Sequence, residues 1–488
     1  HVVSVIGDGS LTGGMAYEAL NNAAHVKSNF IIVLNDNNMS ISPNVGGVSN
    51  YLSGLRTANA YTELKRGVED TLKKIPVKGE KLVSQIKKTK SGLKQFLVPG
   101  MFFEDMGITY LGPVDGHDVR KLYKVFSEAK RLNHAVLVHV LTKKGKGYLP
   151  AEENPSRFHG TPPFVIETGE AKQTSEKDSY TDVFSKVITD VGKKDEKVVT
   201  ITAAMADGTG LNRFAKHFPD RFFDVGIAEE HALTFAAGLA AGGMKPVVAL
   251  YSSFLQRAYD QAIHDVCLQN LPVVLAVDRA GLVGSDGETH QGLFDLSFLT
   301  TIPNMTIMSP KNRWEMADMV RYAIDFQYPI ALRYPRGEAY EGFKEFRTPI
   351  EYGKSEMLYQ ESEIAIVFVG HMAKLAKDVR EELKNRGYSC TLVNARFVKP
   401  LDKEMLVQLA ANHRIFVTIE ENVLSGGFGQ QVLDCVERER LDVYVHSFGI
   451  PDDYVEHGNV DVLRKEVGLE KTNIVEKIIT DYNIARNE

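Results

Sequence analysis

At 488 residues the chain is too long for a single hydrophobic core, and its length favours about three domains. Hydrophobic residues make up 43% of the chain and charged residues 25%, as in ordinary globular proteins. The formal net charge is −6, and no apolar run approaches the roughly 20 residues that span a membrane. The composition therefore indicates neither a nucleic-acid partner nor a membrane partner.

The first residues, Val2 to Ile6, have the pattern of a core strand, and no initiator methionine precedes them. We therefore expect that the chain starts inside a domain and that upstream residues are missing. Further strands are predicted at residues 30–34 (FIIVL) and 135–141 (AVLVHVL), with a helix from Met15 to Ala24. The Lys-rich stretch from Leu64 to Leu97 favours solvated helices. Together these elements predict a first domain over residues 1–165.

Two more regions repeat the alternation of short apolar runs and helical patterns. A Pro- and Gly-rich stretch over residues 150–180 predicts a linker, and the polar passage from Pro335 to Glu361 predicts a second connection. The alternation is typical of parallel sheets covered by helices. We expect three doubly wound α/β domains with mostly parallel sheets, the second over residues 178–345 and the third over residues 355–488. The expected strands are VVTIT, PVVAL, PVVLAVD and PIALRY in the second region, and IAIVFVG, CTLVNA and IFVTIE in the third.

Polar turns follow the first two predicted strands, GDGS at residues 7–10 and NDNN at residues 35–38. The turns lie about 30 positions apart, roughly one strand–helix–strand unit, so we expect both at the same sheet edge. Glycines and a helix N-terminus suit phosphate oxygens. Asp8, the Asn37 amide and the Met39 carbonyl are oxygen ligands that suit Mg²⁺. Either turn alone is better explained as an ordinary turn, whereas the pair favours a metal–diphosphate site.

Glu229 lies at the start of a predicted helix, Ala228 to Ala241, after a short strand. It is either a first-turn acid stabilised by the helix dipole or a buried catalytic carboxyl group. Phe254 is a candidate for stacking on a cofactor ring, although a lone Phe is more often a core residue.

A Gly-rich loop after the third strand of the second region carries Arg279, Asp286 and His290. Polar loops at the ends of strands commonly carry catalytic groups. The segment RYPRG places Arg336 after another strand, where it is either a surface charge or a phosphate ligand. Because Arg279 and Arg336 follow strands of one predicted sheet, the pair suits a phosphate monoester.

Taken together, these motifs resemble the 1-deoxy-D-xylulose-5-phosphate synthase family of transketolase-like thiamine diphosphate enzymes. The resemblance runs in order from residue 1 to about residue 402, and it is weaker in the tail. Ordinary transketolase is similar in architecture but does not carry the SDGETHQG loop or the RYPRG segment in this form. The motifs are GDGSLTGGMAYEALNNA, NDNNMSIS, LGPVDGHD, TKKGKGY, FDVGIAEEHA, YSSFLQRAYDQ, DRAGLVGSDGETHQG, RYPRG and RFVKPLD.

The resemblance implies a homodimer that uses thiamine diphosphate and Mg²⁺ to condense pyruvate with D-glyceraldehyde 3-phosphate, with loss of CO₂. The product, 1-deoxy-D-xylulose 5-phosphate, feeds isoprenoid, thiamine and pyridoxal synthesis. On the cofactor side, the implied metal ligands are Asp8, Asn37 and Met39, the cofactor contacts are Gly9, Ser10, Asn37, Tyr148 and Phe254, and the cofactor-activating acid is Glu229. On the substrate side, the acceptor phosphate would contact Tyr251, Arg279 and Arg336, and Asp286 and His290 would contact the acceptor's hydroxyl groups or the intermediate. His159 would transfer a proton.

The resemblance also implies an upstream segment, with histidines that close over the cofactor, which we expect to be missing from this chain. Three alternatives stay open: a transketolase, a 2-oxo acid dehydrogenase component, or a truncated scaffold without catalysis. The three scattered cysteines are typical of a reducing compartment. We expect the cytoplasm, or the plastid stroma if the source is a plant or an alga.

Overall fold

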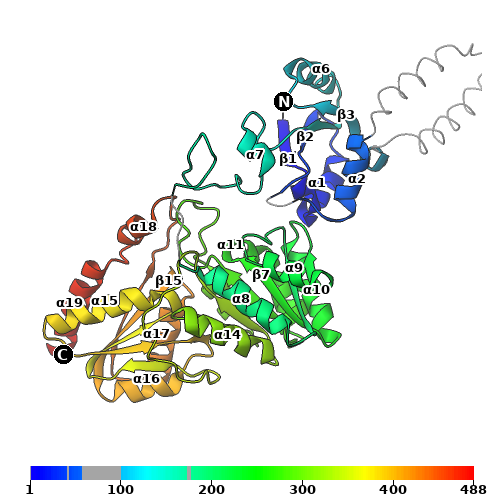
Figure 1. Cartoon of the computed structure of the whole chain (residues 1–488). Coiled ribbons are helices and arrows are strands. Elements are labelled where there is room, and N and C mark those ends of the chain that lie inside the picture. Colours follow the sequence, from blue (N-terminus) through cyan, green and yellow to red (C-terminus); the bar gives the residue numbers. More distant parts are fainter. Residues whose placement is uncertain (1, 41–42, 58–100, 173–176, 488) are drawn as a thin grey trace, which may run out of the picture. The chain divides into compact units, whose positions relative to one another are not determined.

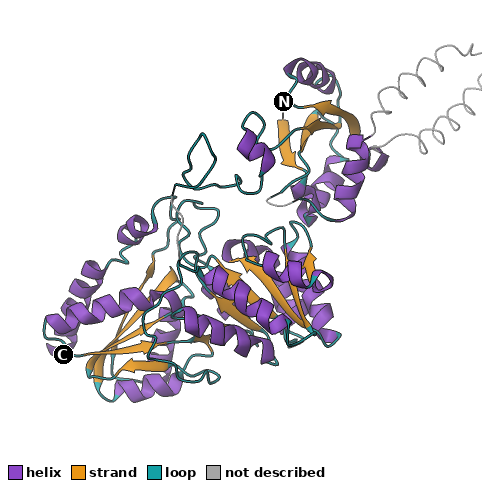
Figure 2. Cartoon of the chain, in the orientation of Figure 1, coloured by secondary structure: helices purple, strands orange, loops and turns teal. Residues whose placement is uncertain are grey.

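The computed structural model describes residues 2–40, 43–57, 101–172 and 177–487 (Figure 1). The solvated helices predicted over Leu64–Leu97 lie outside these residues. Contacts divide the chain into two units, His1–Lys172 with Gly226–Ala228, and Gln173–Val225 with Glu229–Glu488. The described residues form three sheets of four, seven and five strands, with helices packed on them (Figure 2). The α/β class and the mostly parallel sheets are confirmed, whereas the exact domain boundaries stay a prediction.

The first unit holds a parallel four-stranded sheet in the order β1-β2-β4-β3. The strand predicted at Val2–Ile6 forms, but its prediction as a core strand was wrong. Val3 is 51% exposed and Val5 71%, because β1 lies at the sheet edge with β2 as its single neighbour. The sequence analysis missed β3. The strands are β1 (Val2–Gly7), β2 (Phe30–Asp36), β3 (Thr109–Asp115) and β4 (Ala135–Leu141).

In the first unit, α1 begins close to the polar end of β1. A short 3₁₀ turn, η1 (Gly9–Thr12), separates β1 from α1, so the chain does not enter an α-helix directly after the GDGS turn. The side chain of Asp118 accepts from two backbone N–H groups and starts α6. The helices are α1 (Gly14–Ala23), α2 (Gly46–Thr57), α5 (Met101–Asp105), α6 (Val119–Ala129) and α7 (Leu149–Glu153).

A seven-stranded sheet in the order β14-β9-β10-β8-β7-β5-β6 follows in the second unit. Alternate residues such as Val247 and Ala249 pack with Phe184 and Met316 of two covering helices. Because helices cover the sheet, its strands are nearly continuous apolar runs, as the sequence predicts. The strands are β5 (Val198–Thr202), β6 (Phe222–Asp224), β7 (Lys245–Tyr251), β8 (Val274–Asp278), β9 (Thr306–Met308) and β10 (Ile330–Arg333).

The helices around this sheet have clear start signals in the sequence. A reciprocal capping box between Ser179 and Asp182 starts α8, and the Asn312 side chain caps α14. The helix predicted over Ala228–Ala241 is confirmed as α10. The helices are α8 (Tyr180–Gly192), α9 (Asn212–His217), α10 (Glu229–Ala241), α11 (Ser252–Leu255), α12 (Tyr259–Gln261), α13 (Asp295–Thr300) and α14 (Arg313–Asp325), with a π-helical segment at Ala262–Cys267.

Strand β14 (Phe397–Lys399) belongs to the third region by sequence, yet it pairs antiparallel with β9 at the edge of the seven-stranded sheet. A buried ionic network accompanies this exchange. Lys311 Nζ contacts Glu315 at 3.0 Å and Glu356 at 2.6 Å, and Arg396 contacts Glu315 at 2.8 Å. The second and third regions are therefore packed together rather than joined only by the passage at residues 335–361.

The remaining sheet has five strands in the order β11-β13-β12-β15-β16. Its β11 lies inside the passage predicted as a connection, Pro335–Glu361, and pairs antiparallel with β13. The strands are β11 (Glu356–Tyr359), β12 (Glu363–Phe368), β13 (Cys390–Asn394), β15 (His413–Val423) and β16 (Tyr444–Ile450). The helices are α15 (Ala373–Asn385), α16 (Lys403–Ala410), α17 (Phe428–Glu439), α18 (Val460–Glu466) and α19 (Lys471–Asn487).

Glu420 of β15 is fully buried and accepts the backbone N–H groups of Phe428 and Gly429, each at 2.8 Å. Burial raises the pKa of this carboxyl group from 4.5 to about 7, although the two N–H groups oppose the shift. The folded chain therefore holds this proton more tightly than the unfolded chain. Stability from the group is complete below pH 4.5 and is lost as the pH rises through 7.

We expect Glu420→Gln to become more stable relative to the wild type as the pH rises from 5 to 8. The gain is at most about 3 kcal/mol in the free energy of unfolding, because each pKa unit corresponds to about 1.4 kcal/mol. Denaturant titrations at each pH measure it. A difference between the two chains that does not change with pH would contradict the shift.

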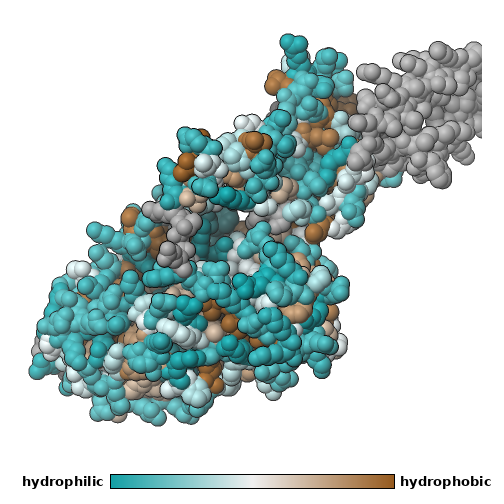
Figure 3. Space-filling model, viewed as in Figure 1, coloured by the Kyte–Doolittle hydropathy of each residue, from teal (hydrophilic) through white to brown (hydrophobic). Residues whose placement is uncertain are grey.

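Surface features add little that is specific. The face drawn in Figure 3 is mostly hydrophilic, with scattered hydrophobic patches. Among the described residues no helix combines the length and the apolar composition needed to cross a membrane. The cysteines Cys267, Cys390 and Cys435 are buried and free.

Candidate active site

The two polar turns of the first unit lie side by side. Gly7 of β1 pairs with Asn35 of β2, and the Asp8 N–H donates to Asn35 O at 3.3 Å. Asp8 Oδ2 accepts from Asn44 Nδ2 at 2.8 Å. A Cβ on Gly9 would lie 2.9 Å from Ser40 Cβ, so only glycine allows this approach. We call Asp8, Asp36, Asn37, Met39 and Asn44 the Asp8 cluster.

Sequence reasoning missed Asp36, although it lies inside the NDNN motif. Its buried Oδ2 accepts from His139 Nε2 at 2.8 Å and from Arg56 Nε at 2.7 Å. His139 Nδ1 in turn lies 2.7 Å from the Tyr110 hydroxyl. Burial opposes the charge of Asp36, but the bonds from His139 and Arg56 outweigh it and lower its pKa to about 2. Asp36 is therefore a fixed anion beside Asp8.

The pKa of Asp8 shifts in the opposite direction to that of Asp36. Burial, followed by the hydrogen bond and charge of Asp36, raises the pKa of the Asp8 carboxyl group to about 6. Its Oδ1 is buried and has no hydrogen-bond partner in the described part of the chain. A buried carboxylate oxygen without a partner, next to a second anion, fits a bound cation.

The donors around Asp8 suit a hard divalent cation only with help from other ligands. Asn37 Oδ1 accepts the Met39 N–H at 3.0 Å, which leaves one lone pair of the amide oxygen free. Over residues 2–40, 43–57, 101–172 and 177–487, no group of three or more His, Cys, Asp or Glu side chains could hold a metal. One carboxylate with amide and carbonyl oxygens fits Mg²⁺ when phosphate oxygens and water complete the shell.

Other cofactor-side candidates lie in the same unit. Lys144 Nζ donates to Ser40 O at 2.6 Å and lies 2.9 Å from His159 Nδ1. Burial lowers the pKa of the Lys144 amino group, and the negative charge of Asp8 opposes this shift. His159 is thus connected to the Asp8 cluster through Lys144. Lys144 lies in the TKKGKGY motif, but the sequence analysis did not assign it a role. Tyr148 packs against Phe158 and donates to Ile166 O at 2.7 Å, and Ser10 is exposed on η1.

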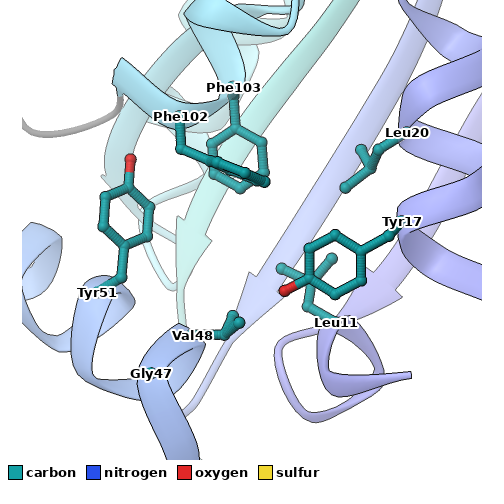
Figure 4. Close-up of a pocket in the computed structure, with 8 residues that line it drawn as sticks. All are labelled: Leu11, Tyr17, Leu20, Gly47, Val48, Tyr51, Phe102 and Phe103. Carbon is teal, nitrogen blue, oxygen red and sulfur yellow. The ribbon is translucent and has the colours of Figure 1, made fainter. Parts of the chain in front are cut away.

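An apolar pocket adjoins this region within the first unit. Figure 4 shows side chains from η1, α1, α2 and α5 around it, with Tyr17 and Tyr51 opposite one another. Its residues are Leu11, Tyr17, Leu20, Gly47, Val48, Tyr51, Phe102 and Phe103. None of the predicted site residues lines it.

In the second unit, Glu229 is the first residue of α10 and is 2% exposed. Burial raises its pKa, while the Arg257 guanidinium opposes the shift through a direct ion pair. A buried carboxyl group with a raised pKa can hold a proton and donate it in a hydrogen bond. Sequence reasoning missed Arg257, which follows Phe254 by three positions in the YSSFLQRAYDQ motif.

Aromatic and basic side chains meet at the ends of β7 and β8. The Arg279 guanidinium carbon lies 3.9 Å from the Tyr251 ring centroid, and Tyr251 stacks on Phe254 at 5.4 Å. The His290 ring meets Phe254 edge-on at 5.2 Å. Arg279 has a φ of 59°, a backbone conformation that is uncommon for residues other than glycine and concentrated at functional sites.

Further ionic contacts hold this arrangement. Arg279 Nη1 donates to Gly208 O at 2.6 Å and contacts the buried Asp278 at 3.0 Å. Arg336 Nη1 pairs with Asp286 Oδ2 at 2.5 Å, and both side chains are partly exposed. We call Tyr251, Phe254, Arg279, Asp286, His290 and Arg336 the Arg279 cluster. It combines two arginines, an imidazole and a carboxylate, which suits a small phosphorylated ligand.

Solved structures define the class of the fold. A split-gene transketolase, described as an inactive β4 tetramer, has a TM-score of 0.57 and 27% identity, covering 62% of this chain and 98% of that chain. Transketolase from Campylobacter jejuni has a TM-score of 0.55 and 16% identity, covering 98% of this chain and 77% of that chain. Models of the transketolase pyrimidine-binding and C-terminal domains match residues 176–341 and 353–474. The chain therefore has a transketolase-type α/β fold.

Sequence relatives identify the branch. The model of the 1-deoxy-D-xylulose-5-phosphate synthase family matches residues 1–142. A synthase of that name from Lachnoclostridium phytofermentans is 55% identical, over 98% of this chain and 76% of the relative. Another from Caldanaerobacter subterraneus is 51% identical, over 100% of this chain and 78% of the relative. The chain belongs to the 1-deoxy-D-xylulose-5-phosphate synthase family.

Proposed function

We propose that this chain catalyses the thiamine diphosphate-dependent condensation of pyruvate with D-glyceraldehyde 3-phosphate, with loss of CO₂, to give 1-deoxy-D-xylulose 5-phosphate. Membership of the family supports the reaction. The observation that carries it is the Arg279 cluster. Arg279 lies over the Tyr251 ring, Phe254 stacks on Tyr251 and meets His290, and the charges of Arg336 and Asp286 also act on Tyr251. Neither a transketolase reaction nor a 2-oxo acid dehydrogenase reaction is favoured by the relatives.

The proposal includes the cofactor contacts expected from the sequence. Asp8, Asn37 and Met39 would hold Mg²⁺, and Gly9, Ser10 and Tyr148 would contact the diphosphate. The unpartnered Asp8 Oδ1 and the raised pKa of that carboxyl group support the metal. Bound thiamine diphosphate supplies the electron sink for decarboxylation. Phe254 would pack against its aminopyrimidine ring.

In this proposal, Glu229 and histidine side chains transfer protons. The Glu229 carboxyl group is buried at a helix N-terminus, and burial raises its pKa, so it would suit proton exchange with a ring nitrogen. His290 and Asp286 would hydrogen-bond the acceptor aldehyde and its hydroxyl groups. His159 would move a proton later in the cycle, and its contact with Lys144 supports a place near the diphosphate.

Acceptor binding would use the two arginines as a phosphate clamp. Arg279 lies against the Tyr251 ring, which fixes the guanidinium plane. Arg336 is paired with Asp286, so an incoming phosphate must compete with that carboxylate or share the guanidinium with it. We further propose a homodimer, and a bacterial cytoplasm because the relatives named above are bacterial.

A substrate comparison tests the function. With thiamine diphosphate and Mg²⁺ present, labelled pyruvate should release CO₂ in proportion to the glyceraldehyde 3-phosphate consumed. A ketose should not replace pyruvate as the donor. Equal CO₂ release without any aldehyde, or transfer from a ketose alone, would exclude this assignment. Failure to bind the cofactor by calorimetry would favour a scaffold without catalysis.

Arg336→Ala should raise the KM for glyceraldehyde 3-phosphate by about 10- to 100-fold, because one arm of the phosphate clamp is lost. The KM for pyruvate should change little. Arg313→Ala is the matched control, since Arg313 pairs with Asp178 and Glu341 away from the cluster. Steady-state kinetics with both substrates measure the effect, and a change confined to pyruvate would assign Arg336 to the other substrate.

A further inference from the structure

The loop that carries Asp286 and His290 has a closed base. Gly281 and Gly292 exchange two backbone hydrogen bonds of 2.7 and 2.8 Å, one in each direction. Inside the base, the Gln291 side-chain oxygen accepts the Val283 N–H at 2.8 Å. We call residues 279–292 the acceptor loop. The contacts that hold the Gly281–Gly292 base therefore set the position of Asp286 and His290.

The base is held by β15 of the five-stranded sheet and by the loop that follows β16. Glu421 of β15 accepts the Leu282 N–H through Oε2 at 2.9 Å, across 139 positions of sequence. Close to this bond, the Val423 N–H donates to Leu293 O at 2.8 Å, and Gln291 Nε2 donates to Glu456 O at 3.0 Å. A Cβ on Gly281 would lie 2.1 Å from Glu421 Oε2, so the carboxylate sits directly against the loop backbone.

Two side chains, Arg464 and His371, hold the Glu421 carboxylate in place. Arg464 Nε of α18 donates to Oε1 at 2.7 Å, and His371 Nε2 lies 2.8 Å from Oε2. Burial opposes the charge, but Arg464 and then His371 outweigh it and hold the pKa of Glu421 well below its usual range. Glu421 is fully buried, and a buried anion is tolerated only with such partners. Every contact of this carboxylate is directional, so its position is fixed in turn by α18 and by the turn at His371.

We propose that Glu421 and Arg464 are positioning residues for the acceptor: they fix the base of the acceptor loop and thereby set where Asp286 and His290 meet the phosphorylated aldehyde. Neither residue touches the Arg279 cluster directly. Their effect on substrate passes through the Leu282 N–H and the Gly281–Gly292 base. This role rests on the proposed function, but the loop attachment itself can be measured without any activity.

Arg464→Ala is the first variant, because the Arg464 side chain is 30% exposed and its loss leaves no large cavity. Glu421→Gln removes the charge but keeps an oxygen that can accept the Leu282 N–H. Arg464→Lys keeps the charge and should restore part of the effect. Arg386→Ala is the matched control, since Arg386 pairs with Glu382 and Glu476 elsewhere on the same sheet's helices. Thermal unfolding of each variant shows that the fold is intact.

Hydrogen–deuterium exchange of the full chain measures how firmly the acceptor loop is held, and steady-state kinetics measure the KM for each substrate. In Arg464→Ala, amides of residues 280–292 should exchange at least 10-fold faster, while those of α17 stay unchanged. The KM for glyceraldehyde 3-phosphate should rise by 5-fold or more, with the KM for pyruvate within 2-fold. Arg386→Ala should alter neither readout.

Unchanged loop exchange in a folded Arg464→Ala variant would overturn the positioning role. So would an equal rise of both KM values, or faster exchange spread over the whole five-stranded sheet, since each indicates a merely structural effect. If the wild type lacks the condensation activity, the proposed function fails by that assay. The exchange measurement then still decides whether Glu421 and Arg464 hold the loop.

Discussion

Glu229→Gln should lower turnover by about 10²- to 10⁴-fold, which is the usual contribution of a positioned proton-transfer group. The carboxyl group is buried at the start of α10, where burial raises its pKa, so it suits a proton exchange that the amide cannot perform. Glutamine keeps the size of the side chain and can still accept from Arg257. The fold should therefore remain, and the loss should appear in turnover rather than in the KM for glyceraldehyde 3-phosphate.

Glu230→Gln provides the matched control for this change. Glu230 is the next residue of the same helix turn and contacts the same arginine, Arg257, at 3.3 Å, but its side chain is 34% exposed. Steady-state rates and thermal unfolding of both variants separate proton transfer from the local ion pair. Near-normal turnover in Glu229→Gln, or an equal loss in Glu230→Gln, would remove Glu229 from the proposed chemistry.

Asp8→Asn should weaken Mg²⁺-dependent binding of thiamine diphosphate by about 100-fold, since a charged oxygen ligand is lost. Without ligands the same change should stabilise the fold at pH 8. Burial, and then Asp36, raise the cost of charging Asp8, whose pKa is about 6 in the fold against 3.8 otherwise. An acid whose pKa is raised by folding contributes its full stability below the lower of the two pKa values, and that contribution is lost above the higher one. For Asp8 the loss is as much as about 3 kcal/mol in the free energy of unfolding.

Titration calorimetry and thermal unfolding, each with and without Mg²⁺, measure the two effects of Asp8→Asn. Asp118→Asn is the control, because it makes the same chemical change in the same unit at a helix cap, where Asn serves as well as Asp. A variant that binds the cofactor normally, or one that is less stable than the ligand-free wild type at pH 8, would contradict the cation site.

Much of the architecture could be predicted from local patterns. Apolar runs such as residues 198–202 and 274–278 are buried strands, and Ser179 with Asp182 marks the start of α8. Glu229 could be placed at a helix N-terminus from the strand that precedes it and the small residues that follow. These features follow from preferences that act over a few residues, such as periodic burial and capping, so a single sequence contains them.

Edge positions and strand exchange were not predictable in the same way. Val2–Ile6 has the apolar pattern of a core strand, yet β1 has one neighbour and its valines are exposed. Strand β14 belongs to the third region in sequence but joins the sheet of the second. Local propensity does not specify which strand becomes a neighbour, because pairing depends on how distant segments pack.

The environment of each candidate group was likewise decided by long-range packing. Asp36 meets His139 across 103 positions, and Glu421 meets Leu282 across 139. The types of chemical group at the strand ends are local properties of the chain, as is the order of its strands and helices. The partners of these groups, such as His139 and Arg257, and the direction in which each pKa shifts came only from the folded structure, because burial and neighbouring charge are created when segments far apart in the chain come together.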